Sequence, residues 1–358
     1  MFSVREPRLV EPCNGTICSG VVESSEGALV VSLDFELRWG VFDSVAADGG
    51  YGAALRGARE AVPRILDAFQ RRDIRATWAT VGALFAESRD ELEAFWPTVR
   101  PQYVNRRRDP YGIDVGSDES DDPLHFAPSL IRQIDKCPGQ EIATHTFSHY
   151  YCAEPGQTAE SFESDLRSAV AIAHHHGYAV SSLVFPRNQV QVAYLPILKR
   201  CGITAFRGEH APLRDGGART KHSLVKRGFG LVDSYVNLTG HNVVPWESVR
   251  HDAALANVAG SRFLRPVSRR FELLDDAQIR RVIAGVRSAA SSRGMYHLWW
   301  HPHNFGTSVA RSMHGLETIL DAFVSLRDQY GIDSRSMRDV AASTLRTSDR
   351  VDDDTQAR

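Results

Sequence analysis

The sequence has 358 residues, of which 42% are hydrophobic and 24% are charged, a composition ordinary for a globular protein with a large buried core. Its 42 Lys and Arg residues nearly balance its 44 Asp and Glu residues, so the formal net charge is only -2. Charge therefore gives no indication of a nucleic-acid partner or of an anionic membrane surface.

The first segment of the chain, residues 1–25, is expected to be an extension ahead of the folded domain. It carries charges and prolines where a signal peptide needs an apolar run, and no stretch of the sequence approaches the ~20 apolar residues of a membrane span. The five cysteines include no CxxC pair, which is typical of free thiols in a reducing compartment. We expect a cytoplasmic protein without a membrane span.

Short apolar runs then alternate with segments of helical periodicity, a pattern typical of β/α units around a largely parallel sheet. The predicted strands are Ala28–Glu36, Ile74–Gly82, Glu141–His149, Ser181–Asn188, Ile203–Gly208, Ser261–Pro266 and Met295–Asn304. The predicted helices are Ala54–Arg71, Ala159–His176, Tyr194–Cys201, Asp275–Arg293 and Leu316–Tyr330. We expect one domain over residues 26–345 and a disordered tail over residues 346–358.

Nearly every predicted strand ends in polar or ionisable residues. The strand ends read DFE, THTFSH, FPRN, FRG and WHPHN. In β/α barrels the chemistry is carried by the carboxyl ends of the strands. These sequences are therefore the first candidates for a functional site.

The DFE sequence contributes two carboxylates, Asp34 and Glu36, at the end of the first strand. Side chains two apart on a strand project to the same face, so both would reach one site. Unpaired carboxylates are costly to bury, so an apolar strand that ends in two of them favours a functional site. The alternative is a solvent-exposed strand end, or ion pairs with arginines such as Arg38 and Arg187.

The HTFSH sequence places His145 and His149 four residues apart, directly after an apolar strand. On one helical turn, two imidazoles at this spacing point the same way and can share a metal ion. Such a pair also arises by chance among 14 histidines. The metal interpretation therefore depends on the other motifs.

The WWHPHN sequence closes the last predicted strand with Trp299, Trp300, His301 and His303 around Pro302. It would form a rigid imidazole site with aromatic walls, suited to a general acid held near a leaving group. The alternative is a buried pair of tryptophans with histidines on the surface.

Together these motifs resemble the polysaccharide deacetylases, also called the NodB homology or carbohydrate esterase family 4 proteins. DFE stands in place of the family's first motif, HTFSH fits its H-[S/T]-x-x-H, FPRN stands at its arginine motif, and WHPHN stands at its final histidine motif. The motifs follow the family's order from Ala28 to about Asn304. The resemblance implies an α/β fold, a distorted (β/α)7 barrel similar to a TIM barrel, and a hydrolase of non-peptide carbon–nitrogen bonds.

The resemblance also implies a metal site. Glu36, His145 and His149 would hold a divalent metal, with zinc expected and Co²⁺, Mn²⁺ or Ni²⁺ as alternatives. The family's common first motif, TFDD, has adjacent aspartates, whereas here Phe35 separates Asp34 from Glu36. This arrangement resembles the D-x-D or D-x-E branch, which includes metal-free, allantoinase-like amidohydrolases.

The remaining roles follow from the resemblance in the same way. Asp34 would be the catalytic base, Arg187 would brace it, and His301 would be the catalytic acid. Three tryptophans are candidates to stack on a sugar ring or to line the acetyl pocket, although each could equally pack within the barrel. They are Trp78, Trp299 and Trp300.

The expected function is removal of an N-acetyl group from an amino sugar or a glycan biosynthetic intermediate. Two alternatives stay open: a metal-free, allantoinase-like amidohydrolase acting on a small amide, and a catalytically silent barrel that binds glycans. The expected partner is an N-acetylated sugar or glycan. The sequence does not indicate the oligomeric state.

Overall fold

The computed structural model describes residues 26–43, 50–208, 238, 240–267 and 272–345. The predicted N-terminal extension and C-terminal tail lie outside these residues. Among the helices of the described part, none has the length and apolar character needed to cross a membrane.

The described strands form one sheet in the order β6-β5-β4-β3-β2-β1-β8-β7, with β9 paired to β1. Every pairing between these strands is parallel. The strands are β1 (Ala28–Phe35), β2 (Ala76–Thr80), β3 (Gln140–Thr144), β4 (Ser182–Val184), β5 (Ala205–Arg207), β6 (Ala256–Asn257), β7 (Arg262–Phe263), β8 (Met295–Trp300) and β9 (Asp333–Arg335).

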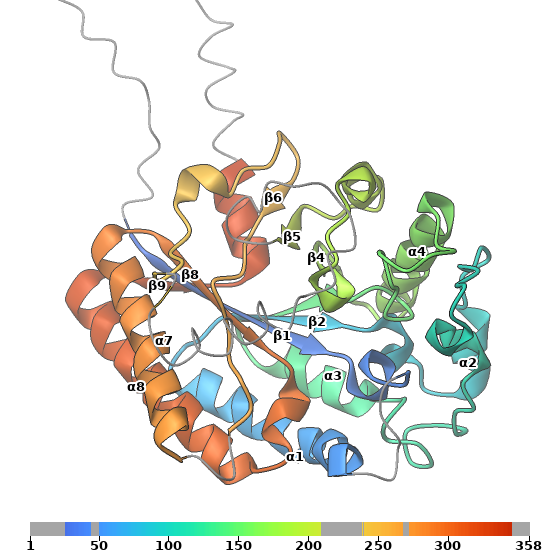
Figure 1. Ribbon diagram of the computed structural model, residues 1–358, viewed down its shortest axis with the longest axis horizontal. Coiled ribbons are helices and arrows are strands. Elements are labelled where there is room, and N and C mark those ends of the chain that lie inside the picture. Colours follow the sequence, from blue (N-terminus) through green and yellow to red (C-terminus); the bar gives the residue numbers. More distant parts are fainter. Residues whose placement is uncertain (1–25, 44–49, 209–237, 239, 268–271, 346–358) are drawn as a thin grey trace, which may run out of the picture.

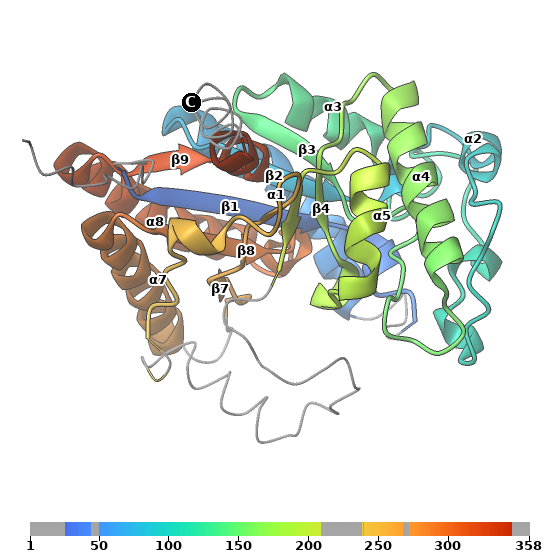
Figure 2. The same ribbon diagram turned by 90° about the horizontal axis from the view of Figure 1, so that it is seen from above.

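Helices surround the sheet, with α7 and α8 side by side at one end of the molecule and α2 and α4 at the other (Figure 1, Figure 2). The α-helices are α1 (Gly50–Arg71), α2 (Arg89–Ala94), α3 (Pro128–Lys136), α4 (Ala159–His175), α5 (Leu195–Arg200), α7 (Glu272–Ser292) and α8 (Val309–Tyr330). Capping residues define the start of α4 and the end of α8. Thr158 and Ser161 form a reciprocal capping box at the start of α4, and Gly331 ends α8 in the left-handed conformation.

One extended segment closes the sheet into a barrel. Its first part, β6, pairs with β5, and its last part, β7, pairs with β8. Between them, Val258 N donates to Phe206 O and Ser261 N donates to His297 O, at 2.8 and 2.9 Å. The segment therefore acts as the strand between β5 and β8, which confirms the expected distorted (β/α)7 barrel.

The two faces of each strand differ in composition, as the two-residue period of a strand requires. The outer face packs large side chains such as Leu33 and Phe35 against the helices. The inner face is lined mainly by small residues, including Ala28, Val30 and Ala79. On β1 this inner face turns polar toward the carboxyl end, where Ser32 and Asp34 follow Val30.

The amino end of the barrel is closed by the last part of the described chain. Strand β9 pairs with the start of β1, and residues 337–345 are helical. From this helix Met337, Val340 and Ala341 join the inner apolar cluster. The carboxyl ends of the strands lie at the other end, where the candidate residues gather.

Candidate metal centre and active site

Three neighbouring elements bring the candidate residues together at the carboxyl end of the barrel. Asp34 is near the end of β1, and Glu36 follows it at the start of the short 3-10 helix η1 (Leu37–Gly40). His145 directly follows β3, and His301 directly follows β8. Because β3 and β8 lie on either side of the β2–β1 pair, side chains far apart in sequence meet here.

Glu36, His145 and His149 form a compact and buried cluster. Glu36 Oε2 lies 3.3 Å from His145 Nε2 and 3.1 Å from His149 Nε2. One ligand atom from each residue lies within 4.8 Å of the other two, and all three residues are buried. A carboxylate and two imidazoles in this arrangement form a suitable ligand set for a divalent metal.

The hydrogen bonding of His145 supports a cation between these groups. His145 Nδ1 lies 2.8 Å from Val184 O, and a carbonyl only accepts, so Nδ1 carries a proton. In the neutral ring, Nε2 then presents a lone pair toward the Glu36 carboxylate, and this buried nitrogen has no hydrogen-bond partner among the described residues. Two lone pairs facing each other in a buried site require a positive charge, which either a second proton on the imidazole or a bound metal ion would supply. The second imidazole beside the same Glu36 oxygen favours the metal ion.

The HTFSH segment adopts a different conformation from the helical turn that its spacing predicts. Strand β3 ends at Thr144, and the following residues form bends and irregular backbone. Thr146 and His149 have positive φ values of 64° and 57°, which an α-helix does not allow. The prediction of a helix was therefore wrong, although the two imidazoles do converge.

Asp165 of α4 holds this segment in place. Its buried carboxylate accepts hydrogen bonds from Phe147 N at 2.7 Å, Ser148 N at 3.2 Å and Ser148 Oγ at 2.5 Å. Burial raises the pKa of Asp165 to about 6, which still leaves it ionised at neutral pH. A charged acceptor thus replaces the regular backbone hydrogen bonds that the irregular segment lacks.

Asp34 is paired with Arg207, the last residue of β5. Arg207 Nη1 and Nη2 donate to the two oxygens of Asp34, both at 2.7 Å. Both residues are buried. The prediction that Arg187 braces Asp34 was therefore wrong, because the arginine at the end of the adjacent strand β5 makes that contact.

Arg187 lies at the edge of the cluster and pairs with a different aspartate. Its Nη2 donates to the two oxygens of Asp43 at 2.9 and 3.2 Å. Its guanidinium carbon lies 4.4 Å from the centre of the Tyr151 ring, which in turn contacts the His149 ring edge-on at 5.4 Å. Arg187 has a φ of 56°, a left-handed backbone that directs its side chain to this position.

His301 and His303 occupy different environments. His301 Nε2 lies 3.8 Å from Asp34 Oδ2 and 3.6 Å from Glu36 Oε1, and its side chain is 23% exposed. His303 is buried, its Nε2 lies 2.8 Å from Tyr51 Oη, and burial lowers its pKa to about 3. His301 is thus the imidazole of this pair that faces both the carboxylates and solvent.

The three tryptophans differ because adjacent residues of a strand point to opposite faces. Trp299 is partly exposed on the inner face, where the Arg207 guanidinium carbon lies 4.2 Å from its ring centre. Trp78 and Trp300 are fully buried in the outer cluster against the helices. The structure therefore corrects the prediction for these two, which are out of reach of a sugar.

Charges within the site determine its protonation states. Burial alone would raise the pKa of Asp34, but the charge and hydrogen bonds of Arg207, together with the charges of His145 and His301, outweigh burial and hold that pKa below its ordinary value. Burial also opposes ionisation of Glu36, yet the nearby imidazoles, His301 first, hold its pKa well below the usual range. Burial lowers the pKa of His149, which favours the neutral ring that a metal requires.

Gly40 provides the space that the Glu36 carboxylate occupies. A Cβ at position 40 would overlap the Glu36 carboxylate carbon and both of its oxygens. Any larger residue at position 40 would displace this carboxylate from the two imidazoles.

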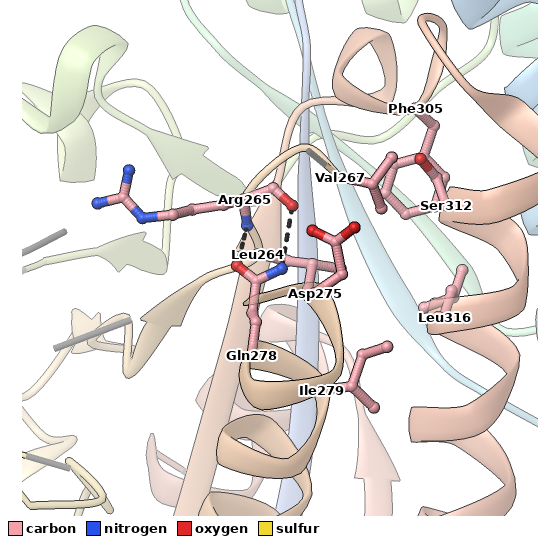
Figure 3. A pocket seen from close by; sticks show the side chains of 10 residues that line it. Leu264, Arg265, Val267, Asp275, Gln278, Ile279, Phe305, Ser312 and Leu316 are labelled. Atoms are coloured by element: carbon pink, nitrogen blue, oxygen red, sulfur yellow. Dashed lines mark hydrogen bonds between the residues drawn. The ribbon is translucent and has the colours of Figure 1, made fainter. Parts of the chain in front are cut away.

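A separate hollow lies on the outer side of the barrel, between α7, α8 and the segment after β7 (Figure 3). Its volume is about 20 Å³, room for about one water molecule. Gln278, one of the residues that line it, accepts from Arg265 N at 2.9 Å and donates to Arg265 O at 3.2 Å, as Figure 3 shows. This hollow is too small for a sugar. The two hydrogen bonds of Gln278 hold the segment after β7 against α7.

The family model described as polysaccharide deacetylase matches residues 45–206. This part of the chain is similar to that family. The matched residues include His145, His149 and Arg187, whereas Asp34 and Glu36 precede them and His301 follows. A comparison with curated protein sequences finds no match.

A comparison with solved structures finds chains that are described as polysaccharide deacetylases or as members of that family. A candidate polysaccharide deacetylase from Mycobacterium smegmatis is 13% identical, with a TM-score of 0.54 over 92% of this chain and 94% of that chain. A candidate polysaccharide deacetylase from Pseudomonas aeruginosa is 10% identical, with a TM-score of 0.45 over 88% and 89%. A family pseudoenzyme from Bacillus anthracis is 12% identical, with a TM-score of 0.41 over 88% and 66%. The first of these supports the fold.

Several residues of the site were missed from sequence. Arg207 ends a predicted strand in the sequence FRG, so the rule that selected the other strand ends would also have selected it. Asp165 and Gly40 carry no such signal, because their roles depend on which segments meet in space. Tyr51 likewise depends on the packing of α1 against η8 (Pro302–Phe305).

Proposed function

We propose that this polysaccharide deacetylase homologue is a metal-dependent hydrolase that removes the N-acetyl group from an amino sugar. The observation that carries the proposal is the buried cluster of Glu36, His145 and His149, with the His145 Nε2 lone pair directed at a carboxylate. Asp34 and His301 flank this cluster. The match to the polysaccharide deacetylase family model supports the reaction type, and the cluster supports the metal.

Zinc suits the proposed site. Two neutral imidazoles and one carboxylate are ligands that zinc accepts at about 2.0–2.2 Å, and Co²⁺, Mn²⁺ or Ni²⁺ could bind the same set. Bound to three protein ligands, such an ion would lower the pKa of a water molecule and polarise the acetyl carbonyl.

The side chains around the cluster would then manage the protons. Asp34, kept ionised by Arg207, accepts the proton that the attacking water loses. His301, directed at the site from β8, donates a proton to the nitrogen as the carbon–nitrogen bond breaks. The products are acetate and the free amino sugar. Trp299, partly exposed beside His301, is the aromatic residue that we propose to contact the sugar.

The substitution Asp34→Asn tests the assignment of the base. Asparagine cannot take a proton from water, so we expect kcat to fall by about 100- to 10,000-fold while the metal content is kept. Acetate release and elemental analysis measure the two quantities. Near-normal kcat with metal bound would contradict the assignment and make Glu36 the next candidate.

The matched control is Asp339→Asn. Asp339 also pairs through both oxygens with an arginine, Arg75, at 2.6 and 2.9 Å, but at the amino end of the barrel. It should leave kcat unchanged. Full activity in protein without metal would favour the allantoinase-like alternative, and binding of glycans without turnover would favour the silent barrel.

A further inference from the structure

A chain of buried hydrogen bonds continues from Asp34 into the interior of the barrel. Arg207 Nη1, which donates to Asp34, also donates to Ser32 Oγ at 2.9 Å. Ser32 Oγ lies 2.8 Å from His297 Nε2, and His297 Nδ1 lies 2.9 Å from Val258 O. The chain thus crosses the barrel from β1 through β5 and β8 to the closing segment.

The strand period explains why these residues meet. Ser32 is two residues before Asp34 on β1, so both project from the inner face. His297 is two residues before Trp299 on β8, and Trp299 lies at the same level of the sheet as Ser32. Ser32, His297 and Arg207 are all essentially excluded from solvent.

The direction of each hydrogen bond is fixed by chemistry. Val258 O only accepts, so His297 carries its proton on Nδ1. Burial lowers the pKa of His297 to about 3, so the ring is neutral and Nε2 accepts from the Ser32 hydroxyl. Ser32 Oγ in turn accepts from Arg207, which only donates. Every proton in the chain therefore has one position.

This chain fixes the guanidinium of Arg207 from one side. On the other side, Arg207 Nη2 donates to Asn188 Oδ1 at 2.9 Å as well as to Asp34. Both terminal nitrogens of Arg207 thus have two acceptors each, so the plane of the guanidinium is set. A fixed plane determines where the two Asp34 oxygens lie, because the pairing is bidentate.

We propose that Ser32 and His297 are positioning residues that orient the base Asp34 through Arg207. The proposal rests on the proposed function for the role of Asp34, whereas the hydrogen-bond chain itself does not. A purely structural role explains the pair less well, because two buried polar side chains in a layer of small apolar residues cost more free energy than an apolar pair. Orientation of a catalytic group is a benefit that offsets this cost.

Kinetics of Ser32→Ala provide the first test. Removal of the hydroxyl frees one side of Arg207, so we expect kcat to fall about tenfold, a typical effect of losing one hydrogen bond to a charged group. KM for the sugar and affinity for zinc should stay within about twofold, because Ser32 touches neither. Ser32→Thr, which keeps the hydroxyl, should restore most of the activity.

A matched control and a double substitution separate positioning from packing. Ser182, also fully buried on the inner face, has a hydroxyl without a hydrogen-bond partner among the described residues, so Ser182→Ala should leave kcat unchanged. In an Asp34→Asn background, Ser32→Ala should cause no further loss, since its effect passes through Asp34. An equal loss in both backgrounds, or in Ser182→Ala, would overturn the proposal.

Nitrogen NMR of histidine-labelled protein tests the chain without any turnover. We expect His297, assigned with the His297→Gln variant, to be the neutral tautomer with Nδ1 protonated between about pH 6 and 8, and its Nε2 signal to shift in Ser32→Ala. Protonation of Nε2 in place of Nδ1 would contradict the hydrogen-bond chain from His297 to Arg207. Wild-type protein that deacetylates no sugar would overturn the proposed function, and the tautomer would still decide whether the chain exists.

Discussion

Two arginines at the active site are divided between two aspartates. Arg207 pairs with Asp34 inside the barrel, and Arg187 pairs with Asp43 at the edge of the cluster formed by Glu36, His145 and His149. Both could be candidates for a brace from sequence, since each ends a predicted strand. The structure shows that Arg207 is the brace, because its side chain, like that of Asp34, projects from the inner face of the barrel.

Substitution of each arginine by lysine tests this division. Lysine keeps the positive charge but cannot form the bidentate contact, so Arg207→Lys should lower kcat/KM by about 10- to 100-fold. Arg187→Lys, the matched control, should change kcat/KM by about threefold or less, because this side chain lies outside the pair with Asp34. A larger loss in Arg187→Lys than in Arg207→Lys would contradict the assignment.

The two histidines of WHPHN provide a second test at the residue scale. His301 faces both carboxylates, whereas His303 is buried against Tyr51 with a pKa of about 3 and is not protonated at neutral pH. His301→Ala should therefore lower kcat on an N-acetyl sugar by about 100-fold or more. It should have little effect on an acetate ester whose leaving group needs no proton.

His303→Ala should affect the amide and the ester equally, since it acts only through packing. The comparison of kcat for the two substrates in each variant is the measurement. A leaving-group dependence in His303→Ala and none in His301→Ala would move the catalytic acid to position 303.

At the scale of elements, short irregular segments place the candidate metal ligands. The sequence predicted that His145 and His149 converge, because their position after a strand end is a property of the chain. The sequence could not predict their backbone conformation. The positive φ values of Thr146 and His149 depend on Asp165, which lies on a helix that begins ten residues after His149. Spacing alone favoured a helical turn.

The short helix η1 supplies another contact that only the structure shows. Gly40→Ala should push the Glu36 carboxylate away from the imidazoles, since this flexible end is the part that can move. Zinc affinity should fall about 10- to 100-fold, a typical effect of disturbing a ligand's support. The melting temperature should change little.

Gly112→Ala is the matched control for this substitution, because a Cβ there would meet nothing within 4 Å. Calorimetric titration with zinc and thermal melts of both variants measure the effect. Unchanged zinc affinity in Gly40→Ala would show that Glu36 is not a ligand.

At the scale of the whole molecule, the alternation of strands and helices predicted a parallel sheet, and the resemblance of the motifs to the polysaccharide deacetylases predicted the barrel. The closing segment was predicted only in part. The predicted strand Ser261–Pro266 contains β7, whereas β6 was missed, because its two residues are too few to show a period. Side-chain direction within strands was also only partly predictable. Trp299 and Trp300 are adjacent on β8, so their side chains point to opposite faces, and the sequence did not show which of the two faces the site.

Metal dependence of acetate release tests the central claim most directly. Protein stripped of metal would be assayed with N-acetylglucosamine oligosaccharides and nucleotide-linked N-acetyl sugars, before and after addition of zinc. Because Glu36, His145 and His149 form one buried ligand set, we predict no turnover without metal and full turnover at about one zinc ion per chain. Undiminished acetate release by the stripped protein would contradict the account.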